Sequence, residues 1–186
     1  MNTTPYTTKA AVEEYLRTTI TGQDSTVTAW ISAASRWIDE YCNRDIFNDE
    51  ESEIAYDGDC SDILHIKDTL KEGLEVTMNG IAVSPLLYPT TKEYASRLVL
   101  DGMIWNRGKQ NIVVTGKVSM FSALPDNVKM AATVLVAGMF NAMNNSGKVG
   151  TKETIGNYSV EYKDGAQTVD YQTAKTTLSS LRRIAL

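Results

Sequence analysis

The stretch that decides the fold is residues 125–147, PDNVKMAATVLVAGMFNAMNNSG. Its apolar residues recur at intervals of three and four, which indicates a helix, and others lie on the remaining faces. Pro125 suits the first position of a helix, and Asp126 follows in the first turn, where negative charge is favourable. A helix that is apolar nearly all round is buried on several sides, so this segment is predicted to form the centre of the fold.

Three further helices are predicted around this segment. The first spans 9–16, and the second, over 25–43, repeats apolar residues at i, i+3, i+4 and i+7 for four turns. The last begins at Asp170 as its cap, with Arg182 and Arg183 in its last turn, where they complement the helix dipole. Its apolar residues form a narrow seam suited to one partner helix: Tyr171, Ala174, Leu178, Leu181 and Ala185.

Between 53 and 118 the pattern changes to short β-prone runs. They are 53–56, 63–66, 74–78, 81–83, 94–100 and 111–118. Asn79-Gly80 is the strongest hairpin signal among them, whereas Pro85 and Pro89 interrupt the pattern. A later hairpin is predicted around the turn pair Gly156-Asn157.

These elements predict an α+β fold. It would be a small helical bundle, with two long helices plus terminal helices, a β-rich insertion and a late β-hairpin. The length of 186 residues favours one domain over 1–186, with 53–118 as a β-rich excursion within it. A composition of 42% hydrophobic and 22% charged residues is that of a globular chain. Cys42 and Cys60 make no disulfide framework, so reduced thiols are expected.

The residues of common enzyme sites are missing. The chain has one histidine, His65, in a short apolar run, so neither a hydrolase triad nor a zinc site can be assembled from imidazoles. Ser146-Gly147-Lys148 resembles the end of a phosphate-binding loop, but Ala142 replaces the required first glycine. No catalytic residue, cofactor or metal is therefore expected, and the chain is predicted not to be an enzyme.

One acidic motif keeps an alternative open. Asp57, Asp59 and Asp62 alternate with small residues and could hold Ca²⁺ or Mg²⁺, which would suit a metal-dependent hydrolase using His65 as well. The calcium-loop pattern, however, requires glycine at its sixth position, where Asp62 stands. A turn between two strands, rich in Asp and Gly because both tolerate unusual backbone angles, is the favoured interpretation.

Charge is unevenly distributed along the chain. The net charge of −5 argues against a strongly basic nucleic-acid binder. Ten of the 23 acidic residues lie in the block 39–62, against one base, Arg44. This acidic block is either a solvated surface or a face that meets a basic partner.

The order of these signatures resembles the head–tail connector (adaptor, or head-completion) proteins of tailed bacteriophages. The motifs that carry the resemblance are the helices 9–16 and 25–43, Tyr56-Asp57-Gly58, the Pro-led segment 124–132, the run 155–160 and Leu181-Arg182-Arg183. Together they cover most of the chain in the expected order.

The resemblance implies a structural virion protein, made in the host cytoplasm and located at the head–tail interface. Such proteins form a ring, expected to be a dodecamer, under the portal protein; the ring extends the DNA channel and receives the next head-completion or tail protein. Twelve copies would carry a charge of about −60, so DNA could pass without sequence-specific binding. No membrane association is expected.

The resemblance also makes the region after the central helix the candidate portal interface. Its residues are Ile155, Tyr158, Val160, Tyr162, Tyr171, Leu178, Leu181, Arg182 and Arg183. Tyrosines are favoured at protein interfaces. The alternative is that the hairpin and last helix close the core of the subunit itself. A tail-completion protein is a further alternative for the function.

Overall fold

The structure is a computed structural model that describes residues 4–145, 152–155, 158–161 and 166–183. The chain divides into two compact units, each described by itself. The helical unit comprises Pro5–Cys42 and Pro125–Leu186, and the β unit consists chiefly of Asn43–Leu124. The expected β-rich excursion, 53–118, lies inside the β unit, which extends further at both ends. That the whole of 1–186 acts as one domain stays a prediction.

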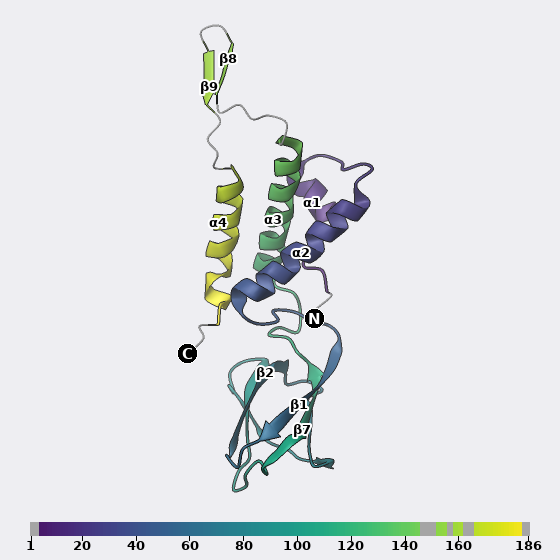
Figure 1. Ribbon diagram of the computed structural model, residues 1–186, viewed down its shortest axis with the longest axis vertical. Helices are drawn as coiled ribbons and strands as arrows, with labels where there is room; N and C mark the ends of the chain where they lie inside the picture. The colour runs from purple at the N-terminus through teal and green to yellow at the C-terminus, as the bar shows by residue number, and fades with distance from the viewer. Residues whose placement is uncertain (1–3, 146–151, 156–157, 162–165, 184–186) are drawn as a thin grey trace. The chain divides into compact units, whose positions relative to one another are not determined.

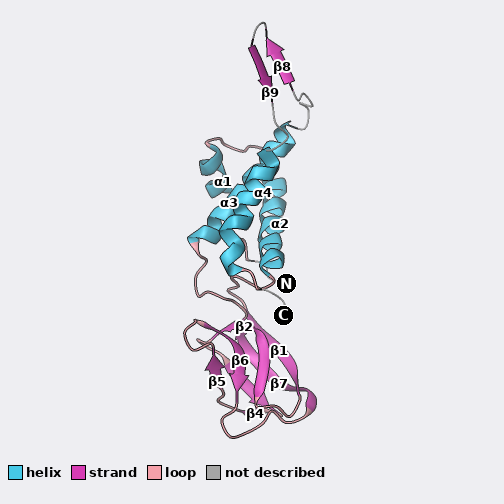
Figure 2. Ribbon diagram, turned by 90° about the vertical axis from the view of Figure 1, so that its left-hand side faces the viewer, coloured by secondary structure: helices cyan, strands magenta, loops and turns pink. Residues whose placement is uncertain are grey.

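The helical unit is built around its central helix (Figures 1 and 2). Its elements are α1 (Lys9–Leu16), α2 (Asp24–Cys42), α3 (Asp126–Asn145), α4 (Ala166–Leu178) and a short 3₁₀ turn, η1 (Ser179–Leu181). Helix α3 contacts α1, α2 and α4. Every residue of 131–137 in α3 is buried, so this segment is the centre of the helical unit, as its all-round apolar pattern predicts.

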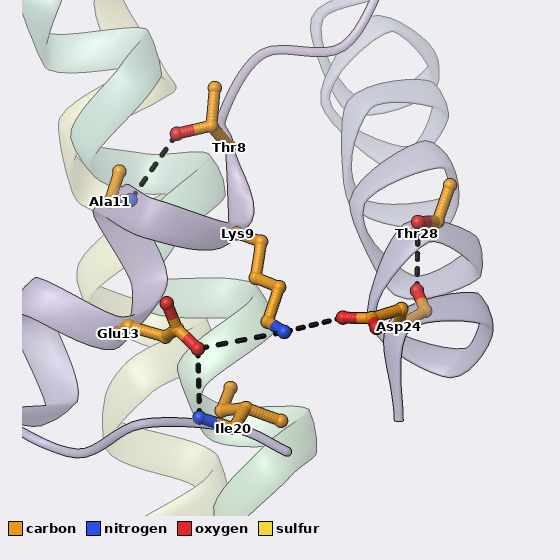
Figure 3. Close-up of polar contacts among 7 residues, drawn as sticks. All are labelled: Thr8, Lys9, Ala11, Glu13, Ile20, Asp24 and Thr28. Carbon is orange, nitrogen blue, oxygen red and sulfur yellow. Dashed lines mark hydrogen bonds and ion pairs between the residues drawn. The ribbon is translucent and has the colours of Figure 1, made fainter. Parts of the chain in front are cut away.

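Polar side chains fix the start of α1 and the turn that leads to α2 (Figure 3). The Thr8 hydroxyl caps α1 by accepting a hydrogen bond from the Ala11 N–H at 3.2 Å. The Glu13 carboxylate accepts one from the Ile20 N–H at 2.8 Å. The Lys9 ammonium donates to Asp24 at the start of α2, and this bond raises the pKa of Lys9.

The last helix differs from its prediction at both ends. Helix α4 begins at Ala166, so Asp170 lies inside it and is not its cap. Alanine and glutamine favour a helix more than aspartate does, which explains why Ala166 and Gln167 already belong to it. Arg182 follows η1 in an extended conformation. The prediction that Arg182 and Arg183 lie in the last turn of the helix is therefore wrong.

The β unit contains two antiparallel sheets. The first has the order β1 (Glu51–Gly58), β7 (Gly108–Lys117), β3 (Glu75–Met78), β4 (Ile81–Ala82). The second has the order β2 (Ile63–Leu70), β6 (Tyr94–Val99), β5 (Leu86–Tyr88). Strand β5 was not expected, because Pro85 and Pro89 flank it. It pairs with β6 at the edge of its sheet, where proline is tolerated.

The two sheets share one hydrophobic core. Its buried members come from β2, β3, β6 and β7 and from the loop after β6: Leu64, Ile66, Val76, Ala95, Leu98, Leu100, Trp105, Ile112 and Val114. Since both sheets contribute their inner faces to this cluster, the outer faces of the two sheets point away from each other.

A separate antiparallel pair completes the secondary structure. β8 (Lys152–Ile155) pairs with β9 (Tyr158–Glu161), with Ile155 opposite Tyr158. This is the predicted late hairpin, whose turn pair, 156–157, lies outside the described residues. With four helices and antiparallel sheets, the α+β class is confirmed.

Candidate partner interface

The structure places the expected portal-binding residues on two elements. Ile155 lies in β8, and Tyr158 and Val160 lie in β9. Tyr162 falls outside the described residues. Tyr171 lies in α4, in the half of that helix whose side chains are not described. For these five residues a role in binding stays a prediction.

The C-terminal part of α4 belongs to the packing of the helical unit. Ala174 and Leu178 are fully buried, and α4 contacts α3. This favours the alternative that the last helix closes the core of the subunit. Leu181 is half-buried, whereas Arg182 and Arg183 are exposed.

Arg182 stands beside the end of α2, in what we term the Tyr41 cluster: Trp37, Tyr41, Lys175 and Arg182. The Trp37 and Tyr41 rings stack, with centroids 5.3 Å apart and planes inclined by 11°. The Arg182 guanidinium carbon lies 5.5 Å from the Tyr41 ring centroid, and the Lys175 ammonium lies 5.8 Å from it. Such cation–π contacts hold both positive groups at one end of the helical unit.

A backbone hydrogen bond strengthens this junction. The Arg183 N–H donates to the Cys42 carbonyl at 2.8 Å and so satisfies one of the carbonyls left open at the end of α2. Trp37 and Tyr41 both belong to the apolar repeat of the helix predicted over 25–43, which by itself is typical of core packing. The sequence does contain a signal for the cluster: two aromatic residues lie four apart on a predicted helix, and two adjacent arginines lie at the end of the last predicted helix.

The acidic motif runs from the end of β1 into the loop that leads to β2: Asp57 lies in β1, and Asp59 and Asp62 lie in the loop. The Gln110 N–H donates to the Asp57 carboxylate at 2.6 Å, and the Ser61 N–H donates to the Asp59 carboxylate at 3.0 Å. Within the described part of the chain, no three His, Cys, Asp or Glu side chains are grouped so that they could hold a metal ion. The geometry therefore favours the turn over the metal site.

We expect Asp59→Asn to leave Tm within about 2 °C of the parent value, because the amide oxygen of the substituted side chain can still accept the Ser61 N–H. Thermal unfolding with and without Ca²⁺ tests this. The Ser61 hydrogen bonds also lower the pKa of Asp59. Their stabilisation is present above the unfolded-state pKa and is lost as the pH falls through the folded-state pKa. A Ca²⁺-dependent rise in Tm that Asp59→Asn abolishes would instead support the metal interpretation.

Comparison with known proteins identifies the family. The model of the head completion protein family matches residues 6–155. The chain belongs to the head completion protein family. This confirms the resemblance to phage head–tail connectors and gives the chain a structural role in the virion. No curated protein sequence matches the chain. None of the helices described is both long and apolar enough to span a membrane.

Solved structures share the fold of this head completion protein. One similar chain comes from the neck of an empty gene transfer agent (GTA) particle, computed with C6 symmetry. It matches with a TM-score of 0.60 at 13% sequence identity, and the match covers 99% of the present chain and 91% of the neck chain. For the neck of the native GTA particle, computed with C12 symmetry, the TM-score is 0.57 at 12% identity, covering 95% and 88%. At these identities the likeness establishes the fold alone.

Proposed function

We propose that this head completion protein forms a closed ring under the portal protein, extends the DNA channel and joins the head to the tail. The family match over 6–155 carries the proposal. The likeness to chains from necks computed with sixfold and twelvefold symmetry supports a ring, for which twelve copies is the natural number. In this proposal the helical unit acts as a small bundle, with α2 and α3 as its two long helices.

The Tyr41 cluster supplies the best-defined portal contact in this proposal. Arg182 and Arg183 are exposed, and the contacts of Arg182 with Tyr41 and of Arg183 with Cys42 hold them in place. A positioned pair of arginines suits an acidic surface, because guanidinium groups bind carboxylates through paired hydrogen bonds. The hairpin residues Ile155, Tyr158, Val160 and Tyr162, together with Tyr171, complete the proposed contact.

The distribution of charge suits a channel for DNA. The β unit, Asn43–Leu124, contains 13 acidic and 8 basic residues, whereas the helical unit contains 10 of each. All of the net charge of −5 therefore belongs to the β unit. A ring with this charge repels phosphates and lets DNA pass without binding it.

Electron microscopy of the purified chain mixed with the portal protein of the same phage tests the proposal. We expect the free chain to be a monomer or weak oligomer and to form a closed ring on each portal, because in this proposal the portal acts as the template. A dimer that is stable at all concentrations in light scattering, with no density added to portals, would contradict the proposal. Rings that bind tail tubes but not portals would favour a tail-completion protein.

The portal contact is tested with matched variants. Arg182→Glu/Arg183→Glu should lose portal binding by at least about tenfold while keeping the circular dichroism of the parent, because neither side chain is buried. Arg36→Glu/Lys129→Glu changes the net charge equally at exposed positions of α2 and α3 and should bind as the parent does. Equal loss in both variants would point to net charge rather than to this contact.

A further inference from the structure

The outer faces of the two sheets in the β unit differ in chemistry. On the four-stranded sheet, Glu51 and Glu53 of β1 and Glu75 of β3 are exposed, and we call these three residues the acidic face. Glu53 and Glu75 both stand in register with Thr115 of β7, so their carboxylates flank one position of the central strand. Lys117, the base opposite Glu51, forms an ion pair with Asp49 at 2.6 Å.

The three-stranded sheet presents apolar and basic side chains outward. Its apolar–basic face consists of two rows in register across β2, β6 and β5: Ile63, Val99 and Leu86, then His65, Arg97 and Tyr88. Ile63 is 37% exposed and Leu86 49% exposed. The exposed Met103 and Ile104 follow Leu100, whose N–H donates to the Asp62 carbonyl next to Ile63. Apolar surface gathered in this way marks an interaction site.

The placement of the two faces restricts what can cover them. They belong to sheets that share one core, so they point in opposite directions. A twofold contact between two apolar–basic faces would bring the Arg97 guanidinium groups of both copies into one contact, which like-charge repulsion disfavours. A head-to-tail contact between copies instead joins two different faces of each subunit, and this is the contact from which rings are built.

We propose that the β units of neighbouring copies associate head to tail, with the apolar–basic face of one copy against the acidic face of the next. This inference rests on the proposed function, because it specifies how copies join in the ring. Arg97 would bind the carboxylates of Glu53 and Glu75, since a guanidinium can pair with carboxylates on both sides of Thr115. Leu86, Tyr88 and Ile63 would supply the apolar centre of the contact.

Charge reversal on each face, followed by mixing, tests the contact. His65→Glu/Arg97→Glu reverses the apolar–basic face, and Glu53→Lys/Glu75→Lys reverses the acidic face. Each variant alone should self-associate at least about tenfold more weakly than the parent in sedimentation and form no rings on portals. An equimolar mixture of the two variants should restore both self-association and ring formation. In the mixture, the intact acidic face of one variant can pair with the intact apolar–basic face of the other, and the two charge-reversed faces can pair with each other. Circular dichroism checks that both variants fold.

The outcomes separate this inference from the proposed function. If the parent forms rings and both variants still do, or if the mixture restores nothing, the head-to-tail contact is wrong and the proposed function stands. If the parent forms no ring with its portal, the proposed function and the head-to-tail contact are both wrong. If only the His65→Glu/Arg97→Glu variant loses assembly, the apolar–basic face binds another protein rather than a second copy, which also overturns the inference.

Chemical cross-linking distinguishes head-to-tail from twofold association. In a Cys60→Ser background, which removes the exposed cysteine and keeps the buried Cys42, Leu86→Cys/Thr115→Cys should give a ladder of covalent multimers with a bismaleimide. Leu86→Cys alone should give monomers, because a head-to-tail contact never brings two copies of this position together. Dimers from the single variant would overturn the proposal in favour of a twofold contact.

Discussion

Arg44→Met should lower the free energy of unfolding of the β unit by about 3–5 kcal/mol, because it leaves the charge of Asp68 buried without its guanidinium partner. The Arg44 Nε lies 3.5 Å from the Asp68 Oδ2, and the side chains are 13% and 4% exposed. The Arg44 Nη1 lies 3.3 Å from the sulfur of Met120, and its guanidinium carbon lies 6.0 Å from the Tyr94 ring centroid. The side chain therefore contacts three separate segments of the β unit.

The loss is measured by urea unfolding followed through Trp105, the tryptophan of the β unit, in a Trp30→Phe/Trp37→Phe background. Arg44→Met/Asp68→Leu should regain much of the loss, because replacing both members of a buried ion pair by apolar residues is often nearly neutral. Lys117→Met, which breaks the exposed pair with Asp49, should leave the unfolding midpoint nearly unchanged. A loss below about 1 kcal/mol for Arg44→Met would mean that the pair is worth no more than a surface one.

Gly58→Ala should destabilise the β unit by about 3 kcal/mol, because a methyl group at this position meets backbone that cannot give way. An added Cβ would lie 1.9 Å from the Asn106 carbonyl oxygen. The Gly58 N–H donates to the Asn111 side-chain oxygen at 3.0 Å, and the Asn111 amide donates to that same Asn106 carbonyl at 2.9 Å. Moving the end of β1 or the loop at Asn106 away therefore breaks a hydrogen bond with Asn111.

The matched control is Gly102→Ala. Gly102 has a φ of 70° but open space around its Cα, so it tests backbone strain without a clash. Its cost should be about 1–2 kcal/mol, the ordinary cost of the left-handed region for alanine. Both variants are compared by Trp105 fluorescence in urea. Equal losses would show that the contact with Asn106 adds nothing. Gly58 also ends the Tyr56-Asp57-Gly58 motif that carries part of the family resemblance, and the clash gives a physical reason for glycine there.

Several elements were predictable because their signals are local. Thr7 or Thr8 can cap a helix over 9–16, and the structure uses Thr8. The apolar run in 125–147 requires a buried helix. Asn79-Gly80 specifies the β3–β4 hairpin, since both residues take positive φ, 53° and 78°, as this turn requires. In each case neighbouring residues alone determine the preferred backbone conformation.

Other features depend on residues far apart in the chain. Strand β5 looked like an interruption, because two prolines flank it, and pairing with β6 is what makes it a strand. The cluster around Arg44 joins it to Asp68, Tyr94 and Met120. In the sequence Arg44 was merely the single base of the acidic block 39–62. No periodicity encodes such a partnership, because the residues meet only after the sheets have formed.

The sequence by itself determined the α+β class, the buried central helix, the absence of known enzyme motifs and the family, because these depend on local periodicity and on the order of motifs along the chain. Only the tertiary structure decided that Leu178 faces the subunit core, that Arg182 and Arg183 are exposed, and that Arg182 lies beside Tyr41. It also decided that the acidic and the apolar–basic faces lie on opposite sheets. The physical reason is that strand pairing and core packing, which join distant residues, determine which side of each element meets solvent.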